Sequence, residues 1–471
     1  MSLDNGIPEQ PAADETRRRG AHAAEPVTET APEPVPAEER EPKTAVLDTV
    51  AAPLDEVPAA TAVLDTVVIE PAATDPVGEL IVTATAWLAQ DPDPETRAEL
   101  RVLLQQAQDR DPAAVADLHS RFDERLAFGT AGLRGEIAAG SNRMNRVLVS
   151  QAAAGLAAFL LEQAPTARPG GIPSVVIGYD GRRNSHVFAT DTAAIMAGAG
   201  VRAILLPRLL PTPVLAFAVR HLGASAGVMV TASHNPPNDN GYKVYLGDAD
   251  AGSQIVSPDD VAIAAQIQRV ADTLLVSDLP RAAYETAPES VVQAYVDATA
   301  AIARPPRAQV NAVYTALHGV GWDTTRRVLD AAGFALPTPV DAQIAPDSAF
   351  PTVAFPNPEE PGAMDLAYET AREVGAELII ANDPDADRLA IAIPDADAAE
   401  GYRRLSGNEV GAILGWRAAV EAQNTPGDGG ATAPSPARSC RPRPSRPWRM
   451  PTGWPSPTPS RASSGSPAPP G

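Results

Sequence analysis

The chain has one cysteine, few aromatic residues and no apolar run long enough to cross a membrane. With Cys440 as its only cysteine, it cannot form an intrachain disulfide or a site with several cysteine ligands. Aromatic residues make up only 4% of the sequence, so its cores must be built from Ala, Val, Leu and Ile. The N-terminal residues are polar and lack an apolar signal core. We therefore expect no membrane partner and a cytoplasmic location.

Basic residues are also scarce. There are 37 Lys and Arg against 59 Asp and Glu, which gives a formal net charge of -22. Almost every basic residue is arginine, since Lys43 and Lys243 are the only lysines. A chain this acidic is a poor partner for nucleic acid, so we expect none. An anionic substrate would need a local basic pocket. The sequence does not indicate the oligomeric state.

The composition changes at both ends of the chain. Residues 1–75 are rich in Pro, Ala, Glu and Thr, and we expect a disordered acidic extension there. Residues 424–471 contain no Leu, Ile, Val or Phe. We expect a low-complexity tail in that segment, either natural or produced by a frameshift near residue 424. We favour the frameshift as a hypothesis, which the gene sequence can test.

Between these ends, strand and helix signals alternate twice, which predicts an α/β fold with mostly parallel sheets. The first alternation has strands predicted over 174–177, 201–206 and 227–230, and helices over 144–163, 184–199 and 212–221. The second has strands over 310–314, 377–381 and 389–393, and helices over 322–332 and 363–374. Further helices are predicted over 95–108, where Asp93-Pro94 forms a start signal, and over 258–275 and 408–423.

The segment Thr231-Ala-Ser-His-Asn-Pro236 follows the apolar run 227–230 and enters a turn predicted over 236–241. A hydroxyl at the end of a rigid strand suits a nucleophile or a phosphate carrier, and Ser233 is in this position. His234, Asn235 and Lys243 are the polar groups around it in the sequence. An ordinary turn serine is the alternative interpretation.

A second polar segment, Asp383-Pro-Asp-Ala-Asp-Arg388, follows another predicted strand. Asp383, Asp385 and Asp387 alternate along it, which places carboxylates on one side of an extended loop. Such a trio suits Mg²⁺ when a phosphate oxygen adds a further ligand, and Arg388 could contact that phosphate. An EF-hand is excluded, because Arg388 and Pro394 occupy its required Gly and Glu positions. A solvated acidic turn, or a phosphatase whose nucleophile is the first aspartate, remains open.

Three other loops carry one candidate residue each. Arg134 lies in the glycine-rich segment 128–135, whose backbone N–H groups could approach an anion. Arg182 lies in the strand-end segment 178–185 and either contacts the Ser233 loop or caps the sheet edge. His318 lies in 317–321, and a lone histidine of this kind is more often structural than functional.

In this order, the segments resemble the α-D-phosphohexomutase superfamily of phosphoglucomutases, phosphomannomutases and phosphopentomutases. Thr231–Pro236 resembles its phosphoserine loop and Asp383–Arg388 its metal loop. The resemblance covers about residues 76–423. It implies tandem α/β domains with mixed, mostly parallel sheets. A phosphoserine domain is expected over 76–285, a metal-binding domain over 286–398 and the start of a third over 399–423.

The resemblance also implies an isomerase that moves a phosphoryl group between the anomeric and distal hydroxyls of a hexose phosphate. Ser233 would carry the phosphoryl group, and the three aspartates with the serine phosphate would hold one Mg²⁺. A sugar 1,6-bisphosphate would be the intermediate and activator. His234, Lys243 and Arg134 are implied as catalytic residues. The residues implied to bind substrate or phosphate are Arg388, Arg182, Asn235 and His318.

Two family loops, one for the sugar and one for the non-transferred phosphate, have no counterpart in a plausible place in this sequence. We therefore expect the chain to hold the phosphoryl-donor half of the site and to be impaired as a mutase. The sequence does not distinguish glucose, mannose and pentose phosphates. A non-catalytic phosphoserine-domain protein and a phosphatase are the rival hypotheses.

Overall fold

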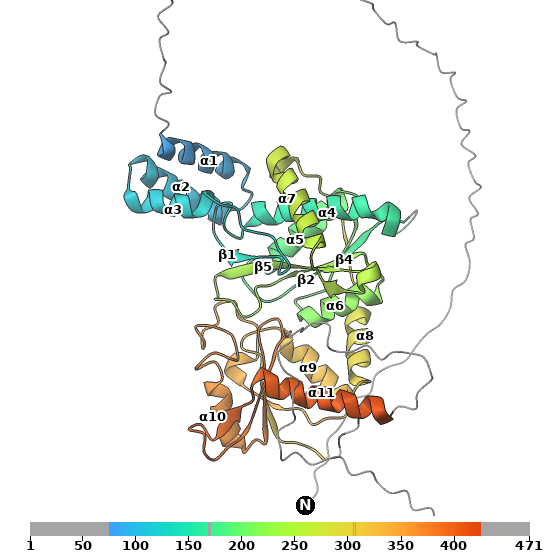
Figure 1. The fold of residues 1–471 in the computed structure, drawn as a ribbon. Helices are drawn as coiled ribbons and strands as arrows, with labels where there is room; N and C mark the ends of the chain where they lie inside the picture. The colour runs from blue at the N-terminus through green and yellow to red at the C-terminus, as the bar shows by residue number, and fades with distance from the viewer. Residues whose placement is uncertain (1–74, 168–170, 305, 307, 425–471) are drawn as a thin grey trace, which may run out of the picture. The chain divides into compact units, whose positions relative to one another are not determined.

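The computed structural model describes residues 75–167, 171–304, 306 and 308–424 (Figure 1). The expected acidic extension and low-complexity tail lie outside these residues, apart from one residue at the edge of each. The domain boundaries proposed from the sequence remain predictions. Two sheets, each with its own helices, make up most of the described chain.

The first sheet has the strand order β1-β5-β4-β2-β3-β7, with β6 paired to β5. Its parallel part contains β4 (Ala226–Val230), β2 (Ser174–Tyr179), β3 (Arg202–Leu205) and β7 (Glu285–Thr286). Its antiparallel part adds β5 (Asp239–Leu246), β1 (Leu133–Glu136) and β6 (Ser253–Gln254). The sheet is therefore mixed, as expected, but parallel pairs do not predominate. β5 also begins inside the predicted turn 236–241 and places Lys243 on a strand.

Helices cover both faces of the first sheet. One face packs against α4 (Arg146–Ala167), α5 (Ser185–Gly198) and α7 (Asp259–Thr273), and the other against α6 (Thr212–His221) and α8 (Glu289–Ala300). Within β2, Val175 and Ile177 face the first group while Val176 faces the second, as the two-residue period of a strand requires. Residues 146–164 of α4 are long and apolar enough to span a membrane, but 72% of that window is buried. Burial and packing show α4 to be a core helix.

Three helices precede the first sheet, namely α1 (Pro76–Gln90), α2 (Pro94–Gln108) and α3 (Pro112–Phe122). Asp93 caps α2 by accepting a 2.9 Å hydrogen bond from the Glu95 N–H, which confirms the predicted start signal. Trp87 and Phe122 pack edge to face in the core of this group, with ring centroids 5.9 Å apart. Sequence patterning predicted only α2 of the three.

The second sheet has the order β12-β11-β10-β8-β9. Its strands are β8 (Ala312–Thr315), β9 (Thr338–Pro339), β10 (Leu378–Asn382), β11 (Leu389–Pro394) and β12 (Tyr402–Arg404). α10 (Asp365–Val374) packs on one face, and on the other Tyr314 contacts Trp322 of α9 (Gly321–Ala331). α11 (Gly407–Asn424) follows β12, and the short helices are η1 (Asp248–Asp250), η2 (Val276–Asp278) and η3 (Asp341–Gln343).

Candidate active site

Ser233 occupies the loop directly after β4, with its backbone in the left-handed region at φ 52°. Its side chain is buried, and its Oγ donates a 2.6 Å hydrogen bond to Asp383 Oδ2. Its own N–H donates to Thr231 Oγ1 at 2.8 Å. A non-glycine residue with positive φ is held there only when its surroundings fix it. The loop is therefore built to aim one hydroxyl at the acidic segment that follows β10 (Leu378–Asn382) of the second sheet.

Asp180 supports this loop from the end of β2. Its Oδ2 accepts the Thr231 hydroxyl at 2.6 Å, and its Oδ1 accepts the Ser185 hydroxyl at 2.6 Å and the Arg182 N–H at 3.0 Å. Complete burial raises the pKa of Asp180, while the nearby Arg182 charge and these donors oppose the rise. Both oxygens of this buried carboxylate are thus satisfied, as a buried polar group requires.

Arg182 holds the Ser233 loop through its main chain. Its Nη2 donates to the carbonyl oxygens of Ser233 and Asn235, both at 2.7 Å. Its Nη1 donates to those of Pro236 at 2.8 Å and Asp239 at 3.1 Å. The sequence left open a contact with the serine loop, and the structure confirms it. Both terminal nitrogens of Arg182 thus donate to carbonyl oxygens, and its predicted phosphate-binding role stays a prediction.

Asp383, Asp385 and Asp387 follow β10 and lie together. Each offers a carboxylate oxygen within 4.8 Å of those of the other two, with Asp383 and Asp385 buried. Ala386, between two of them, has φ 53°, which bends the loop. Asp383 Oδ1 accepts the Arg388 N–H at 2.9 Å, while its Oδ2 receives Ser233. The predicted carboxylate trio and the predicted hydroxyl therefore meet in the structure.

Two groups from around the first sheet bind the same acidic loop. Lys243 Nζ donates to Asp385 Oδ2 at 2.8 Å and to Asp387 Oδ2 at 2.7 Å. Thr212 Oγ1 also donates to Asp385 Oδ2, at 2.6 Å. The other oxygen of this side chain, Asp385 Oδ1, is buried and has no hydrogen-bond partner among the described residues. Sequence reasoning missed Thr212, although it begins a helix after β3, and loops at the carboxyl ends of parallel strands commonly form sites.

The charges of these groups are strongly coupled. Burial, together with repulsion from Asp385 and Asp387, raises the pKa of Asp383 well above its usual value. Burial by itself would raise the pKa of Asp385. The Lys243 charge and the hydrogen bonds that Asp385 accepts outweigh burial and lower the pKa of Asp385 to about 2. Burial disfavours a charged Lys243, yet the two carboxylates raise its pKa above the usual value. The loop thus carries excess negative charge that one ammonium only partly balances.

The remaining predicted residues border this centre. His234 Nδ1 lies 3.2 Å from Ser233 Oγ, and burial, with the charges of Arg388 and Arg134, lowers its pKa to about 4. Its imidazole is therefore neutral at neutral pH. Arg134 on β1 donates from Nη1 to Asn235 Oδ1 at 3.0 Å. The Arg388 side chain is exposed. These groups stay candidates for binding a phosphorylated ligand.

His318 is the last of the predicted site residues. It is buried, its Nε2 lies 2.8 Å from Thr352 Oγ1, and its ring packs edge-on against Phe350 with centroids 6.3 Å apart. No hydrogen bond among the described residues joins it to Ser233 or to the three aspartates. These contacts fit the structural use that is commoner for a lone histidine, and the substrate-binding role of His318 stays a prediction.

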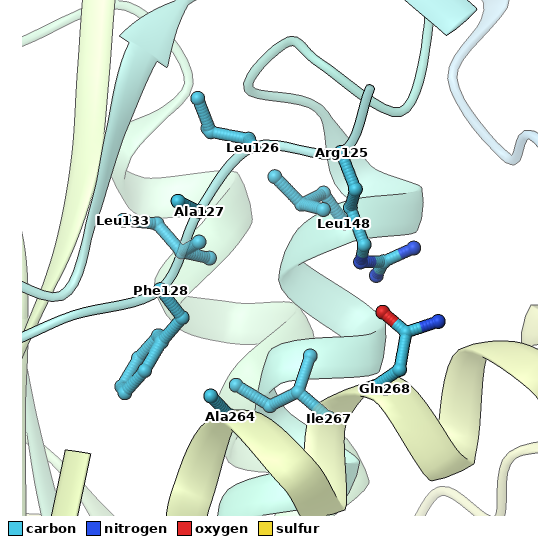
Figure 2. Close-up of a pocket in the computed structure, with 9 residues that line it drawn as sticks. All are labelled: Arg125, Leu126, Ala127, Phe128, Leu133, Leu148, Ala264, Ile267 and Gln268. Carbon is cyan, nitrogen blue, oxygen red and sulfur yellow. The ribbon is translucent and has the colours of Figure 1, made fainter. Parts of the chain in front are cut away.

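One cavity lies apart from these residues (Figure 2). It has a volume of about 150 Å³ and lies beside the glycine-rich segment that ends in β1. Its lining residues are Arg125, Leu126, Ala127, Phe128, Leu133, Leu148, Ala264, Ile267 and Gln268. Arg125 and Gln268 lie at one end of it and Phe128 at the other (Figure 2). None of the converging hydroxyl, carboxylate and cationic groups described above lines this cavity.

The fold and the site together define an α/β protein that holds a strand-end seryl oxygen beside a cluster of three carboxylates. The family models for phosphoglucomutase/phosphomannomutase alpha/beta/alpha domains I and II match residues 125–273 and 293–396. These two regions make up more than half of the chain. The chain belongs to the α-D-phosphohexomutase superfamily, as the sequence motifs indicated.

Individual relatives agree with this assignment. A protein named as a probable phosphomannomutase of Haemophilus influenzae is 57% identical over 285 residues, which is 60% of this chain and 57% of that protein. The phosphoribomutase of Saccharomyces cerevisiae is 36% identical over 356 residues, covering 70% of this chain and 54% of the relative. A solved structure from Thermus thermophilus, assigned as a phosphomannomutase, is 27% identical with a TM-score of 0.51 and covers 64% of this chain and 62% of its own. The chain thus spans little more than half the length of these relatives.

Proposed function

We propose that this chain carries out the chemistry of a sugar-phosphate mutase of the phosphoglucomutase/phosphomannomutase type, with impaired turnover because the two family loops for the sugar and the non-transferred phosphate have no counterpart in its sequence. In this proposal Ser233 carries a phosphoryl group between the anomeric and distal hydroxyls of a hexose phosphate, through a sugar bisphosphate. One observation carries the proposal: Ser233 Oγ lies 2.6 Å from Asp383 Oδ2, so a strand-end hydroxyl and a carboxylate trio form one site. The names of the relatives, which include phosphomannomutase and phosphoribomutase, support the same reaction class.

In the proposed transfer, a sugar hydroxyl oxygen forms a bond to phosphorus as the bond from phosphorus to Ser233 Oγ breaks. In the reverse half-reaction Ser233 Oγ forms a bond to a phosphorus of the bisphosphate as the bond from that phosphorus to the sugar oxygen breaks. The proton of Ser233 Oγ leaves to a nearby acceptor, and the sugar oxygen takes up a proton to become a hydroxyl. Two acceptors lie within hydrogen-bond reach of that proton, Asp383 Oδ2 at 2.6 Å and His234 Nδ1 at 3.2 Å. The loop geometry fixed by Arg182 keeps the oxygen aimed while the group attached to it changes.

The donor set fits Mg²⁺. All three side chains are carboxylates, the ligand type this cation prefers, and the buried Asp385 Oδ1 lacks a hydrogen-bond partner among the described residues. Asp383, Asp385 and Asp387 would hold the cation together with an oxygen of the serine phosphate. Bound there, Mg²⁺ would neutralise charge that develops on the transferring phosphoryl group.

The cationic side chains nearby have separate tasks in this proposal. Lys243 is tied to Asp385 and Asp387, so it would balance the negative charge of the acidic loop. Arg134 and Arg388 would contact phosphate oxygens of the substrate, with Asn235 orienting Arg134. A sugar 1,6-bisphosphate would load the serine. The expected partner is thus a small phosphosugar.

A coupled assay with glucose-1-phosphate, mannose-1-phosphate and ribose-1-phosphate tests the proposal, with Mg²⁺ and a sugar 1,6-bisphosphate present. Labelling of Ser233, seen by peptide mass spectrometry, together with slow isomerisation is the expected result. Ser233→Ala should abolish both, whereas Ser277→Ala, at an exposed serine, should change neither. Release of free phosphate without isomerisation would indicate a phosphatase instead. Loading and turnover both absent would indicate a non-catalytic binding protein.

A further inference from the structure

We propose that Thr212 is a positioning residue for the acidic loop, and that its hydroxyl fixes which oxygen of Asp385 is available to a cation. Thr212 lies in the region matched by the domain I model, and Asp385 in the region matched by domain II. The inference rests on the metal-binding part of the proposed function. It goes further by assigning a role to a residue that neither the motifs nor the family models single out.

Thr212 makes two contacts with one residue 173 positions away in the chain. Its hydroxyl donates to Asp385 Oδ2 at 2.6 Å, and its backbone N–H donates to the Asp385 carbonyl oxygen at 2.9 Å. Thr212 is buried and is the first residue of α6, a helix of 10 residues whose N-cap is Pro211. Free N–H groups at the start of a helix carry partial positive charge, which favours an ionised carboxylate there.

The two oxygens of Asp385 are used unequally. Oδ2 accepts from both Thr212 and Lys243, at 2.6 and 2.8 Å, while the buried Oδ1 accepts from no described residue. A carboxylate held by two donors on one oxygen has a fixed rotation about its last side-chain bond. The free oxygen then keeps a constant direction, as outer hydrogen bonds do for metal-ligating side chains in general.

Lys243 alone would leave this orientation less well defined. Its ammonium also binds Asp387 and sits at the end of a flexible chain, so it can follow either carboxylate as they move. Thr212, by contrast, is fixed by the helix that it begins and has a β-branched side chain with restricted rotation. The backbone bond to the Asp385 carbonyl keeps the loop against α6 even if the hydroxyl is lost. The hydroxyl can therefore be removed without removing the whole contact.

Thr212→Val is the decisive variant, because it keeps the shape and the backbone N–H but removes the hydroxyl. Full-length wild-type and variant chains are titrated with Mg²⁺ alone in a calorimeter, after removal of divalent ions. We expect Thr212→Val to weaken Mg²⁺ binding by about 10- to 100-fold. Thr212→Ser, which restores the hydroxyl, should bind within about 2-fold of wild type. At saturating Mg²⁺, the KM for phosphosugar should stay close to wild type.

A matched control separates this role from general packing. Thr192→Val removes another fully buried threonine hydroxyl, one that donates to the Phe188 carbonyl oxygen within α5. Its Mg²⁺ affinity should remain that of wild type. If Thr212→Val does not fold, Thr212→Ala removes the same hydroxyl with less crowding and is compared with Thr212→Ser.

The outcomes are distinct. If a folded Thr212→Val chain binds Mg²⁺ as tightly as wild type, the inference is overturned and the proposed function still stands. The same conclusion follows if Thr212→Ser fails to restore Mg²⁺ binding. No Mg²⁺ binding by the wild-type chain would overturn the metal site itself, and the role of Thr212 with it. Weak binding by Thr212→Val with recovery in Thr212→Ser supports the inference whether or not turnover is detected.

Discussion

Ser233 and Asp383 are 150 positions apart in the chain, yet the hydroxyl of the first donates a 2.6 Å hydrogen bond to the carboxylate of the second. The bond joins a loop after β4 to a loop after β10, so each sheet provides half of the site. A second set of bonds, from Thr212 and Lys243 to Asp385, runs between the same two loop regions. Three side chains from around the first sheet thus bind the acidic loop of the second.

Lys243→Met should make the chain more dependent on Mg²⁺ for its stability. The ammonium now balances Asp385 and Asp387, so its loss leaves buried carboxylates without a counter-charge. We expect a lower melting temperature than wild type in EDTA and a larger rise on adding Mg²⁺. Differential scanning calorimetry in both buffers measures this. If Mg²⁺ raises the melting temperature equally in both proteins, Lys243 and the cation do not balance the same carboxylates.

Arg182→Lys should weaken the Ser233 loop although it keeps the positive charge. A lysine ammonium lacks the planar fork that reaches four carbonyl oxygens, so some of those buried acceptors lose their donor. We expect destabilisation of about 1–3 kcal/mol in urea unfolding and slower loading of Ser233 by a sugar bisphosphate. Arg183→Lys, at the exposed neighbour, should change neither quantity. If Ser233 is loaded at the wild-type rate in Arg182→Lys, the contacts of the guanidinium are not needed to position the Ser233 loop.

Gly155→Ala should destabilise the packing of α4 against α7. An added Cβ at residue 155 would lie 2.6 Å from the backbone N and Cα of Ile267, closer than real contacts allow. Forcing the two helices apart in this way should lower the free energy of unfolding by about 1–3 kcal/mol. Gly415→Ala, on α11 where an added Cβ meets nothing within 4 Å, should instead be neutral or stabilising by up to about 1 kcal/mol. Urea unfolding of the two variants should give shifts of opposite sign or clearly different size.

His318 should make the protein less stable in mild acid. Burial lowers its pKa from the usual value of 6.5, so the folded chain resists taking up a proton that the unfolded chain binds. Stability is therefore fully present above about pH 6.5 and falls as the pH drops toward the folded-state pKa. His318→Gln should flatten this part of a plot of melting temperature against pH. His221→Gln, at an exposed histidine, should leave the slope as it is.

Sequence reasoning located the parts of the site whose residues lie close together in the chain. The hydroxyl of Ser233 and the alternating aspartates each follow an apolar strand, so the local sequence pattern predicted where each would lie. The folded structure then places the loop after β4 beside the loop after β10. α6 was predicted with its observed bounds, because its start and its apolar stripe are both local signals.

Long-range partners were not predictable in the same way. Nothing near Arg182 in the sequence shows that its guanidinium will meet carbonyl oxygens more than 50 positions away. β5 begins with Asp-Asn-Gly, which is typical of a turn, and its strand conformation depends on pairing with β4 and β1 on either side. The burial of His318 and its contact with Thr352 were likewise not predictable from the residues next to it in the sequence.

The hydrogen bonds from Arg182 to the loop that contains Ser233 affect which substitutions the loop can tolerate during evolution. Arg182 binds carbonyl oxygens, and every amino acid at positions 233, 235, 236 and 239 would present the same oxygen. Side chains next to Ser233 can therefore be exchanged while these main-chain contacts of the loop are retained. A scaffold of this kind permits new ligand preferences to arise without rebuilding the loop that holds the Ser233 hydroxyl.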